Sequence, residues 1–194
     1  MTSRQRSVQN NILLSKELPA IQIKIDPQFT YIGSTNFILY DVAHVEQHHF
    51  IVTDAQKRVQ RRLWFQFEGY LDDNNYKYDY SGMEPLTTND FTFLHNAYVL
   101  NIEDVYREHP TSDSTHVVDF LTEKGYILSG ELMTKRMVWL DADLRNELMI
   151  IYSEILGSTG YRVSDLTEDG PATLEWPALA QALHERALAS FTII

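Results

Sequence analysis

The strongest constraint on the fold is an alternation of apolar and polar residues in the first third of the chain. Isoleucines at positions 21, 23 and 25 alternate with polar residues, and a period of two places successive side chains on opposite faces of a β-strand. Asp26 and Pro27 end the run, because proline lacks a backbone donor and restricts the residue before it. The sequence therefore predicts a strand that ends near Ile25.

A second pattern predicts a long β-hairpin. Residues 43–52 and 59–70 are rich in apolar and aromatic residues, and residues 53–56 between them read Thr-Asp-Ala-Gln. That composition is typical of a turn. Residues 37–40 and the segment from Ala97 onwards also favour strands, so strand signals dominate the N-terminal half.

The second half of the chain begins with a helix signal followed by a strand signal. Ser112, Asp113 and Ser114 offer N-cap oxygens, and Gly125 stands where a left-handed C-terminal residue belongs. A short helix is predicted between them. Residues 131–140 carry apolar side chains on both faces, which is typical of a strand inside a sheet.

Two further helices are predicted towards the C-terminus. Apolar residues from Leu144 to Ile155 follow the spacing of one helical stripe, with Asp141 or Asp143 as the N-cap and Gly157 as the stop. Pro177 opens a terminal helix, since proline fits the first turn, and the apolar residues 179, 182, 183 and 187 share one face of it.

These signals together predict an α+β fold. Strands followed by helices favour a curved antiparallel sheet or partial β-barrel from the N-terminal half, packed with helices from the C-terminal half. Residues 1–19 contain only a short apolar run and are predicted to form a flexible N-terminal arm. Residues 20–194 contain no linker long enough to divide them and are predicted to form a single domain.

Composition narrows the classes of partner. The chain has 194 residues, with 27 acidic and 16 basic residues and no cysteine. The resulting charge of −11 argues against binding to nucleic acid, because it repels a phosphate backbone. The lack of cysteine excludes a disulfide scaffold and favours a cytoplasmic location. No apolar stretch approaches the roughly 20 residues that a membrane-spanning helix needs, so a membrane protein is not expected.

The most suggestive polar cluster lies in the first arm of the hairpin. His44, Glu46 and His48 alternate with other residues, so a strand places them on one face about 6 to 7 Å apart. Two histidines and a carboxylate suit a transition metal. Parallel side chains on one strand do not converge on a single ion, however, so no metal site is assigned.

The hairpin brings a second set of residues to that cluster. If residues whose numbers sum to 112 pair across the hairpin, His44 faces Glu68, Glu46 faces Gln66 and His48 faces Trp64. With Tyr70 as a further aromatic wall, this face would form a polar and aromatic pocket. The predicted ligand-binding residues are therefore His44, Glu46, His48, Trp64, Gln66, Glu68 and Tyr70.

A basic group stands at the tip of the same hairpin. It consists of Lys57, Arg58, Arg61 and Arg62. A solvated hairpin end explains these residues as well as contact with an anion or an acidic surface does.

Three functions remain open. The first is binding of a small molecule in the predicted pocket, whose ligand the sequence does not identify. The second is an enzyme that uses His44, Glu46 and His48 as metal ligands or as acid and base, since histidine beside a carboxylate titrates near neutrality. The third is an interaction scaffold without a pocket. No cofactor is specified. The N-terminal arm and the two-sided apolar strand at 131–140 favour a homodimer.

Overall fold

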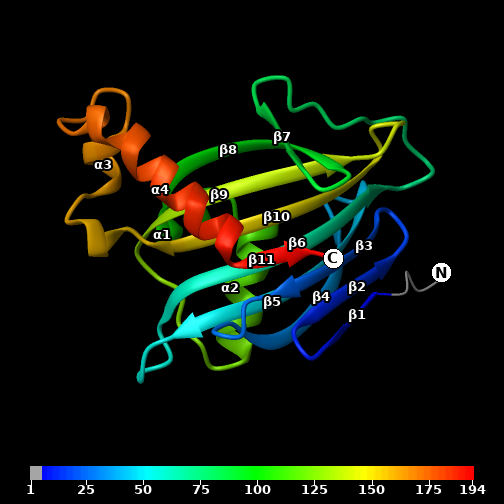
Figure 1. The fold of residues 1–194 in the computed structure, drawn as a ribbon, viewed down its shortest axis with the longest axis horizontal. Helices are drawn as coiled ribbons and strands as arrows, with labels where there is room; N and C mark the ends of the chain where they lie inside the picture. Colours follow the sequence, from blue (N-terminus) through cyan, green and yellow to red (C-terminus); the bar gives the residue numbers. More distant parts are fainter. Residues whose placement is uncertain (1–5) are drawn as a thin grey trace.

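Two antiparallel sheets make up most of the structure, a computed structural model that describes residues 6–194 (Figure 1). The larger sheet has seven strands in the spatial order β4 (Thr30–Leu39), β5 (Ala43–Thr53), β6 (Val59–Tyr70), β10 (Asn146–Ile155), β9 (Glu131–Leu140), β8 (Phe91–Asn101) and β7 (Glu84–Thr88). The smaller sheet has the order β1 (Arg6–Gln9), β2 (Ile12–Lys16), β3 (Ala20–Ile25) and β11 (Phe191–Ile193).

The helices come from the second half of the chain. They are α1 (Ile102–Glu108), α2 (Asp113–Glu123), α3 (Val163–Leu166) and α4 (Trp176–Ala189), with short 3-10 turns η1 (Leu156–Thr159) and η2 (Thr173–Glu175). The predicted α+β class is therefore confirmed. Over residues 6–194 the large sheet ends at the edge strands β4 and β7 and does not close into a barrel.

The large sheet is covered on both faces (Figure 1). On one face, α1 and α2 pack through Ile102, Val117 and Leu121 against Trp64 and Ile151. We call this the α1–α2 face. On the other, α4 and the small sheet pack on a core that includes the fully buried Leu63, Phe65 and Phe67 of β6, and we call it the α4 face. Alternate side chains of β6 thus point into two separate hydrophobic cores, one on each face of the sheet.

Several elements agree with the sequence. Strand β3 ends at Ile25, and β5 and β6 form the predicted hairpin. Helix α2 has Ser112 as its N-cap and is followed by Gly125, whose φ of 78° is left-handed. Helix α4 has Pro177 in its first turn. Strand β9 lies between β8 and β10 as an inner strand.

The helix predicted between Leu144 and Ile155 is wrong, because Asn146–Ile155 form β10 and Leu144 lies in the turn before it. Eight consecutive residues of β10 are buried, and a strand covered on both faces reads as a continuous apolar run that also satisfies a helical spacing. Asp141 does accept backbone hydrogen bonds, from Arg145 at 2.8 Å and Asn146 at 3.2 Å. It organises the turn between β9 and β10, in which Leu144 has a φ of 59°.

Much of the predicted N-terminal arm belongs to the fold. Residues 1–5 lie outside the described residues, but Arg6–Gln9 and Ile12–Lys16 form β1 and β2, and Leu13 is fully buried. The connection is a two-residue turn in which Asn10 and Asn11 both have positive φ, as asparagine tolerates in tight hairpins. Within residues 6–194 no helix is long and apolar enough to cross a membrane.

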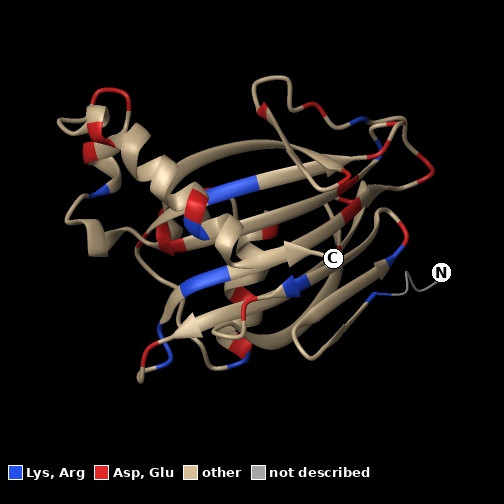
Figure 2. Ribbon diagram, in the orientation of Figure 1, with Lys and Arg blue, Asp and Glu red and all other residues tan. Residues whose placement is uncertain are grey.

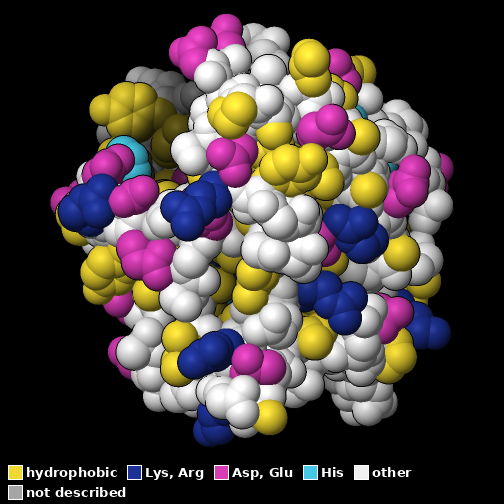
Figure 3. All heavy atoms as spheres, turned by 90° about the vertical axis from the view of Figure 1, so that its left-hand side faces the viewer, with side chains coloured by type: hydrophobic (Ala, Val, Ile, Leu, Met, Phe, Trp, Pro, Cys, Tyr) yellow, Lys and Arg dark blue, Asp and Glu magenta, His cyan; other side chains and the backbone are white. Residues whose placement is uncertain are grey.

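Charged residues are concentrated in loops and at the ends of elements, but β6 and β9 carry basic segments inside the sheet (Figure 2). These are Arg61-Arg62 and Lys135-Arg136. On the surface seen in Figure 3, Lys and Arg side chains lie interspersed with Asp and Glu. The charged residues within the strands, which also include the buried Glu68 and Glu147, are therefore the ones that need a local explanation.

Candidate functional site

The register of the β5–β6 hairpin differs from the prediction by one residue. His44 pairs with Gly69, Glu46 with Phe67 and His48 with Phe65, so paired numbers sum to 113. Only the pair nearest the turn, Thr53 with Val59, has the predicted sum of 112. An irregularity between Val52 and Thr53 separates the two registers, and a bulge of this kind shifts all later pairs by one position.

The shift divides the predicted binding residues between the two faces of the sheet. His44, Glu46 and His48 share the α4 face with Phe65 and Phe67, whereas Trp64, Gln66 and Glu68 lie on the α1–α2 face. The structure therefore does not bring these six side chains into one concavity. Their role in ligand binding stays a prediction, and the two groups have different surroundings.

On the α4 face, Glu46 and His48 belong to a chain of polar contacts. The Tyr31 hydroxyl lies 3.2 Å from His48 Nδ1, and His48 Nε2 lies 2.8 Å from Glu46 Oε1. Arg6 donates to Glu46 Oε2 at 2.9 Å. His44 is exposed. Among the described residues no group of three or more histidine, aspartate or glutamate side chains is arranged to hold a metal ion.

On the α1–α2 face, Gln66 lies at the centre of a buried network. It accepts a hydrogen bond from Gln47 Nε2 at 2.7 Å and donates to Glu68 Oε2 at 2.7 Å and to Asp113 Oδ2 at 3.3 Å. This network links the hairpin to the start of α2. Tyr70 lies apart from it, stacked on Tyr78 with ring centroids 4.4 Å apart.

Two glutamates meet at one end of the same face. Glu68 and Glu147 are directly opposite each other on β6 and β10, and both are buried. Tyr78 donates to Glu68 at 2.9 Å and Tyr80 donates to Glu147 at 2.7 Å. Burial raises the pKa of Glu68 to about 7, and burial together with the neighbouring Glu68 raises the pKa of Glu147 well above its ordinary value. The pair is therefore partly protonated near neutral pH.

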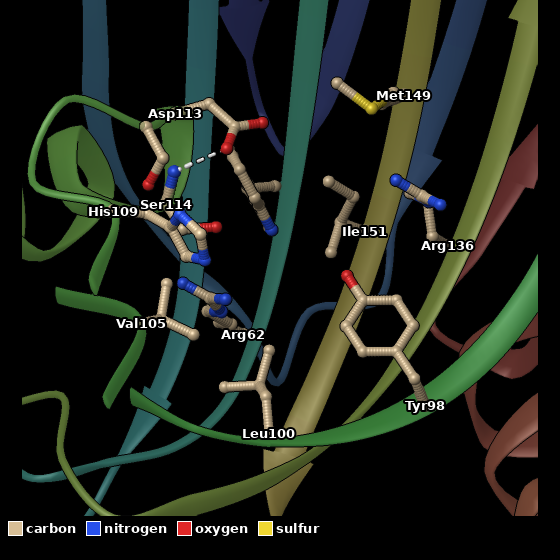
Figure 4. A pocket seen from close by; sticks show the side chains of 12 residues that line it. Arg62, Tyr98, Leu100, Val105, His109, Asp113, Ser114, Arg136, Met149 and Ile151 are labelled. Carbon is tan, nitrogen blue, oxygen red and sulfur yellow. Dashed lines mark hydrogen bonds between the residues drawn. The ribbon is translucent and has the colours of Figure 1, made fainter. Parts of the chain in front are cut away.

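Further along β6 the sheet and the α1–α2 turn enclose a cavity of about 250 Å³ (Figure 4). We call it the Arg62 pocket. Its apolar lining consists of Trp64, Tyr98, Leu100, Val105, Met149 and Ile151. Its polar lining consists of Arg62, His109, Ser112, Asp113, Ser114 and Arg136. His109 is exposed, so the pocket reaches solvent beside the α1–α2 turn.

Arg62 is the least expected residue in this lining. Its side chain is buried, with 3% of the residue exposed. Its Nε donates to Ser153 Oγ at 3.3 Å, and its guanidinium lies 5.3 Å from the ring of Trp64. Its Nη1 has no hydrogen-bond partner in the described part of the chain. Burial lowers the pKa of Arg62 to about 10, so the group still carries its charge at neutral pH.

A second unpaired donor lines the same pocket. Trp64 Nε1 is buried and, like Arg62 Nη1, makes no hydrogen bond within residues 6–194. The indole nitrogen can only donate, and a guanidinium can only donate. Two buried donors that make no hydrogen bond are unfavourable, and a ligand group with several acceptor atoms would satisfy them.

The opposite wall of the pocket is the beginning of α2. Ser112 caps the helix by accepting from the Thr115 backbone, and Asp113 Oδ1 accepts from the Ser114 backbone at 2.6 Å. Arg136 is held aside by Asn96, which accepts from its Nε at 3.3 Å, while its guanidinium lies over Tyr98 at 5.8 Å. Of the two arginines in this lining, Arg62 is thus the one with a buried nitrogen, Nη1, that makes no hydrogen bond within residues 6–194.

The sequence placed Arg62 in a basic hairpin tip that was either solvated or in contact with an anion or an acidic surface, and the structure buries it instead of solvating it. The available signal was the period of two, which puts Arg62 on the same face of β6 as Trp64 and Gln66. Asp113 was identified only as a helix-cap residue. Its approach to β6 depends on tertiary packing that no local pattern indicates.

No protein-family model, curated protein or solved structure matches this chain significantly.

Proposed function

We propose that this protein binds a small molecule that carries an oxoanion, with Arg62 as the anion-binding residue. The observation that carries the proposal is the buried, charged guanidinium that lines a cavity and whose Nη1 makes no hydrogen bond in the part of the chain that the structure describes. Guanidinium groups pair with carboxylates and phosphates through charge-assisted hydrogen bonds. Trp64 Nε1 offers a second donor beside it.

Energetics support this proposal over a purely structural role. A buried donor of a charged group that is left without a hydrogen bond costs about 1–3 kcal/mol or more, and Arg62 Nη1 is such a donor. Such a cost is expected where a binding site is organised in advance for a ligand of opposite charge. The apolar walls formed by Trp64, Met149 and Ile151 suit the uncharged body of the ligand.

The enzyme predicted from His44, Glu46 and His48 has less support. Glu46 and His48 contact each other, Arg6 and Tyr31, and this arrangement occupies the groups that a metal or substrate would need. The scaffold alternative has no specific observation in its favour. We therefore retain small-molecule binding as the proposed function.

The test uses thermal unfolding with a simple carboxylate probe, 3-phenylpropanoate, at increasing millimolar concentration. A ligand present at 100 times its Kd stabilises the folded state by about 2.7 kcal/mol, which corresponds to a rise in Tm of about 5–11 °C for a chain of this length. The amide 3-phenylpropanamide has nearly the same shape without the charge and is expected to have no effect.

Matched variants assign the binding to Arg62. Arg62→Met is expected to abolish the shift. Arg61 is the adjacent arginine, lies on the opposite face of β6 and donates to Gln28. The Arg61→Met variant is therefore expected to show the same rise in Tm as the wild type. An equal shift in the wild type and in Arg62→Met would contradict the proposal.

Three sequence-based expectations remain proposals alongside this one. They are a cytoplasmic location, the lack of nucleic-acid binding and a homodimer. One argument for the dimer is weakened, because β9 is covered on both faces by this chain and needs no partner subunit for its apolar residues. Light scattering over a range of concentrations measures the oligomeric state.

A further inference from the structure

The Arg62 pocket contains a carboxylate as well as the guanidinium. Asp113 lies at the first position of α2 and Arg62 lies on β6, so the two charges come from opposing walls (Figure 4). Within residues 6–194 they form no direct ion pair, and Arg62 Nη1 makes no hydrogen bond. The pocket therefore presents separated charges of opposite sign to whatever it holds.

Asp113 has the capacity to accept further hydrogen bonds. Its Oδ1 accepts from the Ser114 backbone at 2.6 Å and its Oδ2 accepts from Gln66 at 3.3 Å. An ionised carboxylate has about four acceptor positions. A ligand with a donor group can therefore reach Asp113 without displacing the contacts that hold it.

Neither a simple anion nor a simple cation matches both walls. A lone carboxylate or phosphate at Arg62 is repelled by Asp113, and a lone ammonium group at Asp113 leaves Arg62 unpaired. A molecule with adjacent positive and negative groups matches both charges and leaves no buried charge uncompensated.

The remaining lining determines the rest of the ligand. Trp64, Leu100, Met149 and Ile151 provide an apolar wall. The cavity of about 250 Å³ is slightly smaller than the roughly 300–1,000 Å³ of pockets for drug-sized ligands. This size suits one small molecule and excludes a nucleotide or a long peptide.

We propose that the ligand is a free amino acid with an apolar side chain, whose carboxylate binds Arg62 and whose ammonium group binds Asp113. This inference rests on the proposed function, because it assigns the ligand class of the same pocket. Arg62 and Trp64 Nε1 donate to the carboxylate, Asp113 accepts from the ammonium group, and the side chain packs on Met149 and Ile151.

The experiment compares two pairs of probes by isothermal titration calorimetry on the full chain. Phenylalanine is paired with 3-phenylpropanoate, and leucine with 4-methylpentanoate. Within each pair the second compound lacks only the amino group. Since a charge-assisted hydrogen bond contributes a factor of about ten or more in affinity, at least one amino acid is expected to bind about tenfold more tightly than its deaminated partner.

Two variants of α2 locate that preference. Asp113→Asn is expected to reduce the ratio within the pair to about one, because it weakens amino-acid binding and removes the repulsion of the plain carboxylate. Asp119→Asn is the control: this exposed residue of the same helix accepts from Tyr106 and is expected to leave the ratio unchanged. Because the ratio is measured within one variant, a general loss of stability does not change it.

Each outcome discriminates between the two proposals. If the deaminated compounds bind the wild type as tightly as the amino acids and still require Arg62, the amino-acid inference is overturned and the proposed function stands. The inference is also overturned if the preference persists in Asp113→Asn. If neither member of either pair binds the wild type, the inference and the proposed function both fail.

Discussion

Replacing Arg62 by methionine is expected to stabilise the ligand-free protein. Burial lowers the pKa of Arg62 to about 10, and at about 1.4 kcal/mol per pKa unit a depression of this size corresponds to roughly 3 kcal/mol against the charged form. This penalty is present in full at pH 7, because it is relieved only when the pH rises through the pKa of the folded state. Methionine fills similar space without a charge.

Two favourable contacts are lost in the same change. The hydrogen bond to Ser153 at 3.3 Å contributes about 1 kcal/mol. The guanidinium at 5.3 Å from the Trp64 ring contributes roughly another 1 kcal/mol. The net expectation is a free energy of unfolding about 1 kcal/mol higher, with a Tm about 2–4 °C higher for a chain of this length.

The assay is urea unfolding at pH 7, followed by tryptophan fluorescence and by circular dichroism, with no added ligand. Arg61→Met is the matched control, because it removes the same side chain from the opposite face of β6. This variant loses the hydrogen bond to Gln28 and the cation–π contact in which the guanidinium lies 5.6 Å from the Phe29 ring. A decrease of no more than about 1 kcal/mol is expected for it.

The opposite result for Arg62→Met would refute the reasoning. Removing one partner of a buried ion pair destabilises a protein by about 3–5 kcal/mol, since it leaves the other charge uncompensated. A loss of that size would mean that Arg62 already has an anionic partner within the chain, and the pocket would not require one from a ligand.

Three other predictions concern the polar groups and the backbone. Stability is expected to fall as the pH rises from about 4.5 to 7, because Glu68 binds its proton more tightly when folded; Glu68→Gln should reduce this decline by about 3 kcal/mol in urea titrations at each pH. Glu46→Gln should cost about 2 kcal/mol by leaving Arg6 without its carboxylate, and an effect no larger than that of the exposed His44→Gln would contradict the buried pair. Gly33→Ala should cost about 1–3 kcal/mol in calorimetry, because its φ is 127° and a Cβ would lie 3.2 Å from Phe120; an unchanged Tm would show that this backbone is not strained.

The parts of the fold that were predictable are those with local signals. The alternation before Pro27 marks β3, and Ser112 and Gly125 mark the two ends of α2. In each case one short segment contains both the hydrophobic pattern and the residue that ends it. In these segments the hydrophobic pattern and the capping residues predict the same element that tertiary packing favours.

The parts that failed depend on long-range packing. Residues of β10 satisfy both a helical stripe and a buried strand, and only burial between β6 and β9 decides between them. The hairpin register depends on one irregularity between Val52 and Thr53, which the apolar pattern does not reveal. Because a one-residue slip exchanges the two faces of a strand, this single feature separated His48 from Trp64.

The Arg62 pocket could be only partly anticipated for the same reason. The period of two places Arg62 beside Trp64 on one face, but its burial depends on α1 and α2 covering that face. Asp113 reaches the pocket because α2 begins opposite Gln66. A contact between residues 66 and 113 is a property of the tertiary structure and has no counterpart in the local sequence.

The most direct test of the central claim is the guanidinium signal of Arg62 in a nitrogen-15 NMR titration. The Nε–H resonance is assigned by its loss in Arg62→Met, and phenylalanine and 3-phenylpropanoate are each titrated into the wild type. We predict a saturable shift of the Arg62 resonance with the Kd found by calorimetry, while the resonance of Arg61 stays in place. An Arg62 resonance that does not move at saturating concentrations of either probe would contradict the assignment of this pocket as an anion-binding site.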